Sequence, residues 1–375
     1  MFLRNNYTQD SRIIKETETL SNEFDIEVIC QQDKKDDEKI IKKNKLIIRR
    51  VVPYYSDNRI ILKFQNYILF PAISAIHGAL TKADIYQAND ADTLIQAYIS
   101  AKLNRGKILY DSHEIFSELE MNKNNIFLGS IFNLIESVII PNTDARITTN
   151  EHRAKFLEEK FGKKFQIMEN YSTQKYAPKD YDMIKKRIRK EYGVLSSDTL
   201  FIYCGRIHNR RIEETLRAFE KVKNKNIRFL IAGNTQKYKL RVSDDRVALL
   251  GRVDAKKVTE LEIASDVGFI FYEPTNLNNI YASSNKIFSY MTNGCAIITS
   301  NDILTNRETV ENEKTGLCVN PANEKEIQKA IQWMIDNPKE VEIMKKRGMK
   351  AAKDKYNWEA NESRFINIYL DLMKK

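Results

Sequence analysis

Residues 279–295 read Asn-Ile-Tyr-Ala-Ser-Ser-Asn-Lys-Ile-Phe-Ser-Tyr-Met-Thr-Asn-Gly-Cys, and this stretch carries the strongest fold signal in the chain. Apolar runs flank it at 267–272 and 295–299, and both are short and rich in β-branched or aromatic residues, as buried strands are. Between the runs, serine and asparagine offer helix N-caps and Gly294 offers a stop. The stretch therefore predicts a strand, a loop, a short helix and a second strand.

The N-terminus of such a helix lies at the carboxyl end of a parallel strand, where α/β proteins bind anions. Free backbone N–H groups and Lys286 in the first turn would suit a diphosphate. The same residues also fit an ordinary βαβ crossover that carries a surface lysine.

Length and composition indicate a globular protein of two domains, since 375 residues exceed what one core usually organises. No apolar run approaches the roughly 20 residues of a membrane span, and the N-terminus lacks the apolar core of a signal peptide. The four cysteines are scattered among apolar runs, which is typical of reduced core residues. We therefore expect a cytoplasmic protein.

The net charge of +10 is unevenly distributed, because residues 1–180 hold 26 basic and 25 acidic residues. The positive excess thus lies in the second half of the chain, where the phosphate site is expected. No zinc-finger spacing, RNP motif or helix-turn-helix signal accompanies it, so nucleic acid is not an expected partner.

Two series of alternating strands and helices predict two doubly wound, Rossmann-like α/β domains. A polar stretch that ends at Pro178 separates the series. We expect a first domain of residues 1–172, joined by a C-terminal helix in 357–375, and a second domain of residues 173–356.

Residues 203–212, Tyr-Cys-Gly-Arg-Ile-His-Asn-Arg-Arg-Ile, follow the first strand of the second domain. Gly205 would allow a close backbone approach, and the guanidinium groups of Arg206 and Arg211 would suit a diphosphate leaving group. On the residues alone, a solvated basic turn explains the pattern equally well.

Residues 107–116, Lys-Ile-Leu-Tyr-Asp-Ser-His-Glu-Ile-Phe, form a strand that ends in polar side chains. His113, with Asp111 and Glu114 beside it, would bind a sugar or an acceptor hydroxyl. The alternative is a structural histidine that a nearby carboxylate satisfies. Asp90, in the turn after another strand, is a weaker substrate-binding candidate, because a capping turn also accounts for it.

These motifs together resemble the retaining GT-B glycosyltransferases of the GT4 family, along nearly the whole chain. Residues 281–294 are similar to that family's Y-x-x-P-N-K-x-F-E-Y-x-x-x-G segment, which covers the sugar diphosphate of the donor and whose Glu binds the ribose. Residues 205–212 resemble G-R-L-x-x-x-K-G, and residues 111–114 resemble D-x-H-E. Two positions depart from the first segment: Ser284 replaces the proline, and Ser289 replaces the ribose-binding glutamate.

The resemblance implies two domains that face a cleft, with the last helix returning to the first domain, and it implies site residues. His113, Arg206 and Arg211 would be catalytic, and Asp90, Asp111, His113 and Glu114 would bind substrate. The residues that would bind the donor are Gly205, Arg206, Arg211, Gly233, Gly251, Tyr281, Ala282, Ser283, Ser284, Asn285, Lys286 and Ser289. No metal is expected to be required, since Arg206, Arg211 and Lys286 supply positive charge.

The resemblance also implies an acceptor that is a glycan or a polyprenyl-linked lipid. A basic segment, Lys39–Lys45, precedes a helix region with Tyr54, Tyr55, Phe64, Tyr67 and Phe70, and together they would contact a membrane surface. A basic loop followed by a core-packing helix is the alternative. The loop at 4–12, without glycine, would either admit a bulky acceptor or cap the helix that begins near Ser11.

The sequence therefore predicts a metal-independent glycosyltransferase that uses a nucleotide-diphosphate sugar. Two rivals remain: a glycosyltransferase-like partner subunit that does not turn over the donor, and another GT-B activity such as epimerisation or phosphorolysis. The first rival is kept because the family's E-x7-E pair is replaced by Tyr281 and Ser289 and because two of its glycines are absent. The short neutral side chain of Ser289 cannot bind two ribose hydroxyls as a glutamate does. A loss of nucleotide affinity in Ser289→Glu would indicate that the site was not built for an ordinary ribose contact.

Overall fold

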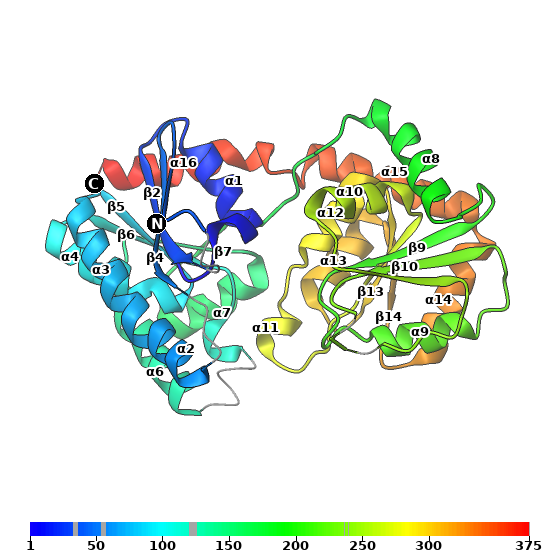
Figure 1. The fold of residues 1–375 in the computed structure, drawn as a ribbon, viewed down its shortest axis with the longest axis horizontal. Helices are drawn as coiled ribbons and strands as arrows, with labels where there is room; N and C mark the ends of the chain where they lie inside the picture. The colour runs from blue at the N-terminus through cyan, green and yellow to red at the C-terminus, as the bar shows by residue number, and fades with distance from the viewer. Residues whose placement is uncertain (33–36, 54–57, 120–125, 236, 239, 375) are drawn as a thin grey trace. The chain divides into compact units, whose positions relative to one another are not determined.

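The computed structural model describes residues 1–32, 37–53, 58–119, 126–235, 237–238 and 240–374 (Figure 1). They form two compact units, Met1–Asn170 with Asn361–Lys375, and Tyr171–Ala360. Each unit is built on its own, mainly parallel sheet with helices on both faces. The prediction of two doubly wound α/β domains is therefore confirmed.

The first unit contains an eight-stranded sheet in the order β3-β4-β2-β1-β5-β6-β7-β8. All neighbours pair in parallel except β3 and β4, which form an antiparallel hairpin at the edge. The strands are β1 (Phe2–Leu3), β2 (Ile26–Gln32), β3 (Ile40–Lys43), β4 (Leu46–Pro53), β5 (Ile85–Asn89), β6 (Lys107–Ser112), β7 (Ala145–Thr148) and β8 (Gln166–Ile167).

Neighbouring residues of β5 show how helices cover both faces of this sheet. Tyr86 points toward α4, where its hydroxyl accepts a hydrogen bond from Asn104, and Gln87 points toward α1 and α16. The helices are α1 (Ser11–Leu20), α2 (Arg59–Phe64), a π-helical turn η2 (Gln65–Leu69), α3 (Phe70–Thr81), α4 (Leu94–Asn104), α6 (Ile126–Ile139), α7 (Glu151–Phe161) and α16 (Glu359–Met373). Thus the C-terminal helix α16 packs on the first unit, next to α1 (Figure 1).

The second unit contains a six-stranded, fully parallel sheet in the order β11-β10-β9-β12-β13-β14. The strands are β9 (Thr199–Cys204), β10 (Ile227–Ala232), β11 (Val247–Gly251), β12 (Val267–Ile270), β13 (Ala296–Ser300) and β14 (Gly316–Val319). The helices are α8 (Tyr181–Glu191), α9 (Ile212–Glu220), α10 (Ala255–Ala264), α11 (Leu277–Ile280), α12 (Asn285–Asn293), α13 (Leu304–Glu313), α14 (Glu324–Asp336) and α15 (Pro338–Asp354).

The stretch 279–295 forms the unit that its sequence predicts. Ser284 is the N-cap of α12, and Gly294 ends the helix with a positive φ of 76°. A Cβ at Gly268 of β12 would lie 2.3 Å from the ring of Tyr290, so the glycine lets α12 pack closely on the sheet. The helix N-terminus is consequently held at the carboxyl ends of the strands.

Two expectations about local structure need correction. The basic segment Lys39–Lys45 is not a loop, because most of it forms β3 and the turn into β4. Of the aromatic residues assigned to a membrane surface, Phe70 is buried in the core and Tyr67 packs against Phe132, whereas Phe64 is exposed. Tyr54 and Tyr55 lie outside the described residues. Within the described residues, no helix is long and apolar enough to cross a bilayer.

Candidate functional site

The loops that follow β9, β10 and β11 surround a cavity of about 400 Å³ in the second unit. Its lining residues are Gly205, Arg206, Ile207, Ala232, Gly233, Asn234, Lys237, Tyr238, Arg252, Val253 and Val258. Larger cavities of about 580 and 790 Å³ occur at the amino ends of the strands of the first and the second unit. The smaller cavity is the better candidate, because doubly wound sheets bind ligands at the carboxyl ends of their strands.

Two glycines bring the backbone turns of this cavity together. A Cβ at Gly233 would lie 2.2 Å from the carbonyl oxygen of Gly205, so any side chain there would force the turns apart. Gly205 has a φ of 142°, and a Cβ on it would lie 2.8 Å from Nζ of Lys286. The ammonium group of Lys286 therefore reaches from α12 to the turn that lines the cavity. The φ of Gly251, at the end of β11, is also positive at 68°.

The N-terminus of α12 offers fewer free donors than the sequence suggests. The backbone N–H of Ser284 donates to Oδ1 of Asn306 at 3.1 Å, and the Ser284 hydroxyl contacts the hydroxyl of Tyr272 at 3.3 Å. Among the described residues, no acceptor faces the backbone N–H groups of Asn285 and Lys286. These two amides, with the Lys286 ammonium, remain available to an anion.

The residues just before α12 connect it to the short helix α11. The N–H of Tyr281 donates to the carbonyl of Leu277, and the N–H of Ala282 donates to the carbonyl of Asn279. The hydroxyl oxygen of Ser283 is buried and has no hydrogen-bond partner in the described structure. Of the predicted donor-binding residues in this loop, Ser283 thus has an unused polar group.

The two predicted arginines have different surroundings. Arg206 is exposed and lines the cavity. Arg211 is instead held by carboxylates, with Nη1 2.9 Å from Glu214 and Nε 3.5 Å from Glu273. The sequence did not indicate this neutralisation, nor that the guanidinium of Arg210 stacks 3.7 Å from the ring centre of Tyr272.

Ser289 points toward a buried carboxylate of α10. Its hydroxyl donates to Oε1 of Glu262 at 3.0 Å, and the side-chain amide of Asn293 donates to Oε2 at 2.7 Å. Burial raises the pKa of Glu262 to about 7, although these hydrogen bonds and the charge of Lys286 act in the opposite direction. The sequence analysis did not identify Glu262. The one feature that could have indicated it is a glutamate within the apolar run Leu261-Glu-Ile-Ala264.

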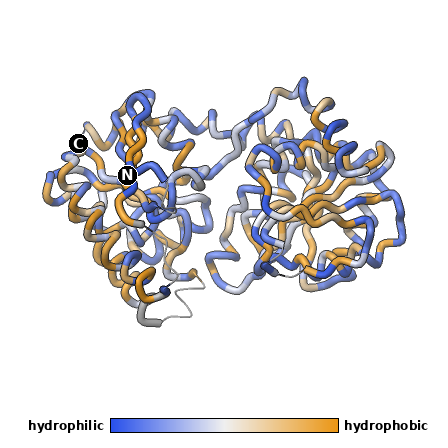
Figure 2. Tube along the Cα trace, in the orientation of Figure 1, coloured by the Kyte–Doolittle hydropathy of each residue, from blue (hydrophilic) through white to orange (hydrophobic). Residues whose placement is uncertain are grey.

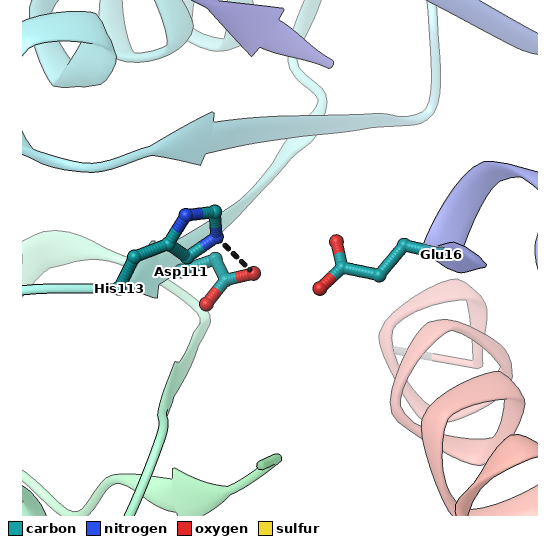
Figure 3. A group of neighbouring side chains, drawn as sticks. All are labelled: Glu16, Asp111 and His113. Atoms are coloured by element: carbon teal, nitrogen blue, oxygen red, sulfur yellow. Dashed lines mark hydrogen bonds and ion pairs between the residues drawn. The ribbon is translucent and has the colours of Figure 1, made fainter. Parts of the chain in front are cut away.

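In the first unit, a buried ionic network surrounds the end of β6. Arg12 of α1 pairs through Nη2 with Asp111 at 2.8 Å and through Nε with Glu16 at 2.8 Å. His113 Nε2 lies 3.0 Å from the second oxygen of Asp111, and Glu16 points toward the same carboxylate (Figure 3). Arg12 thus contacts the substrate-binding candidate Asp111 directly.

Asp90 holds His113 from the other side. Its Oδ1 accepts the backbone N–H groups of His113 at 2.8 Å and Glu114 at 3.2 Å. Its Oδ2 lies 3.8 Å from Nδ1 of the His113 ring. The φ of Asp90 is 64°, a costly conformation for a non-glycine residue and one that often occurs at functional sites.

The network keeps its histidine charged. Although burial opposes it, the carboxylate of Asp111 raises the pKa of His113 to about 10. Burial would likewise raise the pKa of Asp111, but the charges of Arg12 and His113 lower it to about 2. Burial and Asp111 raise the pKa of Glu16 to about 8, and burial raises that of Asp90 to about 7. His113 is therefore a hydrogen-bond donor at neutral pH rather than a general base.

Glu16, Asp111 and His113 also have the spacing of metal ligands, with one candidate atom of each within 4.8 Å of the others. Arg12 contacts the carboxylates of both Glu16 and Asp111, so it already supplies the positive charge that a metal ion would bring to them. Asp90-Ala-Asp92 has the D-x-D spacing of a metal motif, but Asp92 pairs with Arg4 at 2.8 Å. We assign no metal to either group.

The network extends to the C-terminal helix. Nε2 of Gln87 donates to Glu16 at 3.2 Å, and the hydroxyl of Tyr369 in α16 donates to Oε1 of the same glutamine. Asp10 belongs to the 4–12 loop, whose role the sequence left open, and it caps α1 by accepting the N–H groups of Arg12 and Ile13, each at 3.2 Å. Capping is thus one function of the 4–12 loop.

Two doubly wound units, with the last helix returned to the first, define the GT-B fold, and solved structures agree. Sucrose-phosphate synthase from Thermosynechococcus elongatus has 17% identity and a TM-score of 0.76, covering 100% of this chain and 99% of that one. Anabaena HepE in complex with UDP-glucose has 12% identity and a TM-score of 0.74, covering 99% and 98%. WaaG, a glycosyltransferase involved in lipopolysaccharide biosynthesis, has 12% identity and a TM-score of 0.61, covering 97% of each chain.

Part of the second unit matches a known family. Residues 198–337 match the family model described as "Glycosyl transferases group 1". This part of the second unit is accordingly similar to the group 1 glycosyltransferases, the GT4 family, in agreement with the resemblance seen in the sequence. No curated protein matches the sequence.

Proposed function

We propose that this protein is a glycosyltransferase that transfers a sugar from a nucleotide-diphosphate sugar to a hydroxyl group of a glycan or a lipid-linked acceptor. The proposal rests on one observation: the ammonium group of Lys286 lies against the Gly205 turn of the cavity beside β9 and β10. A cation, free helix amides and an exposed arginine next to a cavity suit a diphosphate joined to a flat base.

In this proposal the second unit binds the donor. Lys286 and the N–H groups of Asn285 and Lys286 hold the diphosphate, and Arg206 stabilises the charge that develops on it as the glycosidic bond breaks. The base enters the cavity between Gly233 and Arg252, next to Tyr238. Anabaena HepE, with the same fold, holds UDP-glucose in its structure, which supports a nucleotide sugar as donor.

The first unit binds the acceptor or the transferred sugar through His113, with Asp90, Asp111 and Glu114 around it. The charged imidazole of His113 donates a hydrogen bond to a sugar hydroxyl, and Asp111 fixes its orientation. Transfer proceeds with retention and without a protein nucleophile, as in the family. Positive charge comes from side chains, so no metal is required.

A turnover assay tests the proposal. Purified protein is incubated with UDP-, GDP- and CDP-sugars, and release of the nucleoside diphosphate is measured with and without lipid-linked acceptor. We expect release from one donor class, and at least a tenfold loss in Lys286→Met. The matched control is Lys325→Met, which removes an exposed lysine from α14. Equal activity of Lys286→Met and wild type would refute the diphosphate assignment.

A partner subunit without turnover is the second candidate, favoured by the neutralised Arg211 and by the bond between Ser289 and Glu262. It predicts no release from any donor and no nucleotide binding. Isomerised or hydrolysed donor in the absence of acceptor would instead indicate another GT-B chemistry.

We further propose that the protein acts in the cytoplasm and makes peripheral contact with a membrane that carries its acceptor. WaaG, with the same fold, is involved in lipopolysaccharide biosynthesis, and this supports a role in making a surface polysaccharide or glycolipid.

A further inference from the structure

The outer side of the helix region α2–η2–α3 exposes large apolar residues at a regular spacing. Ile60, Phe64, Ile68, Ile76 and Leu80 are all exposed, and Ile60 and Leu80 reach 77% and 72%. They are separated by four residues or by eight, so they form one ridge along the helix. At 1.5 Å per residue this ridge is about 30 Å long.

The neighbouring helices continue the apolar surface. α4 packs beside α3, where Ser100 and Asn104 donate hydrogen bonds to the carbonyls of Ala75 and Ala79 at 3.2 and 2.9 Å. Its outer side exposes Leu103 by 70%. α6 packs beside α4 and exposes Leu134 by 65%. Figure 2 shows the hydrophobic colouring of α2, α3 and α6.

The charge on this face has one sign. Residues 59–82 and 94–105 contain no aspartate or glutamate, and the single acidic residue of α6, Glu136, is buried and pairs with Lys160. Four exposed cations belong to the same helices or their ends: Lys63, Lys82, Lys102 and Arg105. Within the described chain, none of the four forms an ion pair with a carboxylate.

We propose that this face, defined by the exposed apolar residues of α2–η2–α3, α4 and α6, docks on an anionic lipid bilayer. Apolar side chains enter the interface between headgroups and acyl chains, and the cations pair with lipid phosphates. The inference deepens the proposed membrane contact and revises its predicted location. The helix with Phe64 is kept, α4 and α6 are added, and buried Phe70 and the strand β3 are left out. A bilayer is favoured over a protein partner because apolar and cationic groups lie together without any exposed carboxylate on these helices.

Vesicle co-sedimentation tests the proposal without requiring transfer activity. We expect the wild-type protein to sediment with vesicles of phosphatidylcholine mixed with phosphatidylglycerol, and much less with phosphatidylcholine alone. Raising the salt from about 0.1 M to about 1 M shortens the Debye length from about 10 Å to about 3 Å and should weaken binding. The triple variant Lys82→Gln, Lys102→Gln, Arg105→Gln should lower the partition coefficient roughly a hundredfold.

The apolar contribution is tested by Ile76→Glu with Leu80→Glu, which should abolish sedimentation. The matched control is Met183→Glu with Leu195→Glu, since these residues of the second unit are exposed by 66% and 61%. Circular dichroism spectra that match the wild type show that the variants are folded. Vesicle binding that persists in the Ile76 and Leu80 variant would overturn the proposal.

Two further outcomes separate this proposal from its rivals. Failure of the wild type to bind any vesicle, with a dimer that Ile76→Glu and Leu80→Glu convert to a monomer, would show that a second copy covers the face instead. Vesicle binding without any donor turnover would leave the docking surface intact and refute the proposed enzymatic function alone.

Discussion

The hydroxyl of Ser289 lies 3.0 Å from Oε1 of Glu262, so the residue at the expected ribose position is bonded to a buried carboxylate of a neighbouring helix. Glu262 is only 2% exposed and accepts a second hydrogen bond from Asn293 at 2.7 Å. A carboxylate that the family pattern places at position 289 is thus present close by, on α10. This relationship changes what a glutamate at position 289 would do.

Ser289→Glu should destabilise the second unit, because it places a second carboxylate against a buried one. We expect a fall in melting temperature at pH 8 that is larger than the fall in Ser289→Ala, which removes only the hydrogen bond. Adding Glu262→Gln to Ser289→Glu should restore much of the loss. If Ser289→Glu melts like the wild type, Glu262 does not face this position in solution.

The pH dependence of stability should report Glu262 directly. Its folded pKa is raised from 4.5 to about 7, so the folded state keeps a proton that the unfolded state loses between these values. The contribution of Glu262 to the free energy of unfolding is fully present below pH 4.5. It is lost as the pH rises through about 7, and the total loss is about 3 kcal/mol. Glu262→Gln should remove that loss, so its stability relative to the wild type should increase over this range. Denaturant titrations at several pH values measure the free energy of unfolding of both proteins. If it depends on pH in the same way in the wild type and in Glu262→Gln, Glu262 does not have the raised pKa.

Arg206→Ala should reduce kcat for donor turnover roughly a hundredfold to a thousandfold, because Arg206 is exposed and lines the cavity. Arg211→Ala should have a smaller effect on turnover, since Glu214 and Glu273 already neutralise its guanidinium. Steady-state kinetics of both variants make the comparison. A larger effect at Arg211 would mean that these ion pairs open when donor binds.

The C-terminal helix should influence His113 through Tyr369. Tyr369→Phe leaves Oε1 of Gln87 without its donor, which should cost about 1–3 kcal/mol of stability. It should also lower kcat and shift its pH profile, since Gln87 bonds to Glu16 and Glu16 to Arg12. The matched control is Tyr86→Phe, which removes a partly buried hydroxyl bonded to Asn104 on the opposite face of the same sheet. Equal effects of both variants on kcat would indicate a purely structural role.

Much of the fold is predictable because local signals agree with the tertiary structure. The helix Asn285–Asn293 has an N-cap, an apolar side and a glycine stop, and the flanking strands are apolar throughout. Strand Ile40–Lys43 was missed because an exposed edge strand rich in lysine resembles a loop. Helix Leu304–Glu313 was missed because its polar sequence has little amphipathic pattern.

The candidate site was predictable only in part, for a different reason. Residues such as Gly205, Arg206 and Lys286 stand out because glycine and cations after strands have a direct chemical meaning. The sequence does not reveal the roles of Arg12, Glu16 and Glu262, because these roles depend on burial and on partners from distant segments. A single sequence contains no local signal for such pairing.

The central claim is that the Gly205 turn and Lys286 bind the diphosphate of a nucleotide. The most direct test is titration calorimetry with UDP, GDP and CDP on the wild type and on Gly205→Ala, whose Cβ would meet Nζ of Lys286 at 2.8 Å. The control is Gly193→Ala, at a positive φ of 64° but with open space around its Cβ position. We expect one nucleotide to bind the wild type and the control, and binding to Gly205→Ala to be at least tenfold weaker. Nucleotide binding that Gly205→Ala leaves unchanged, or no binding by the wild type, would contradict the claim.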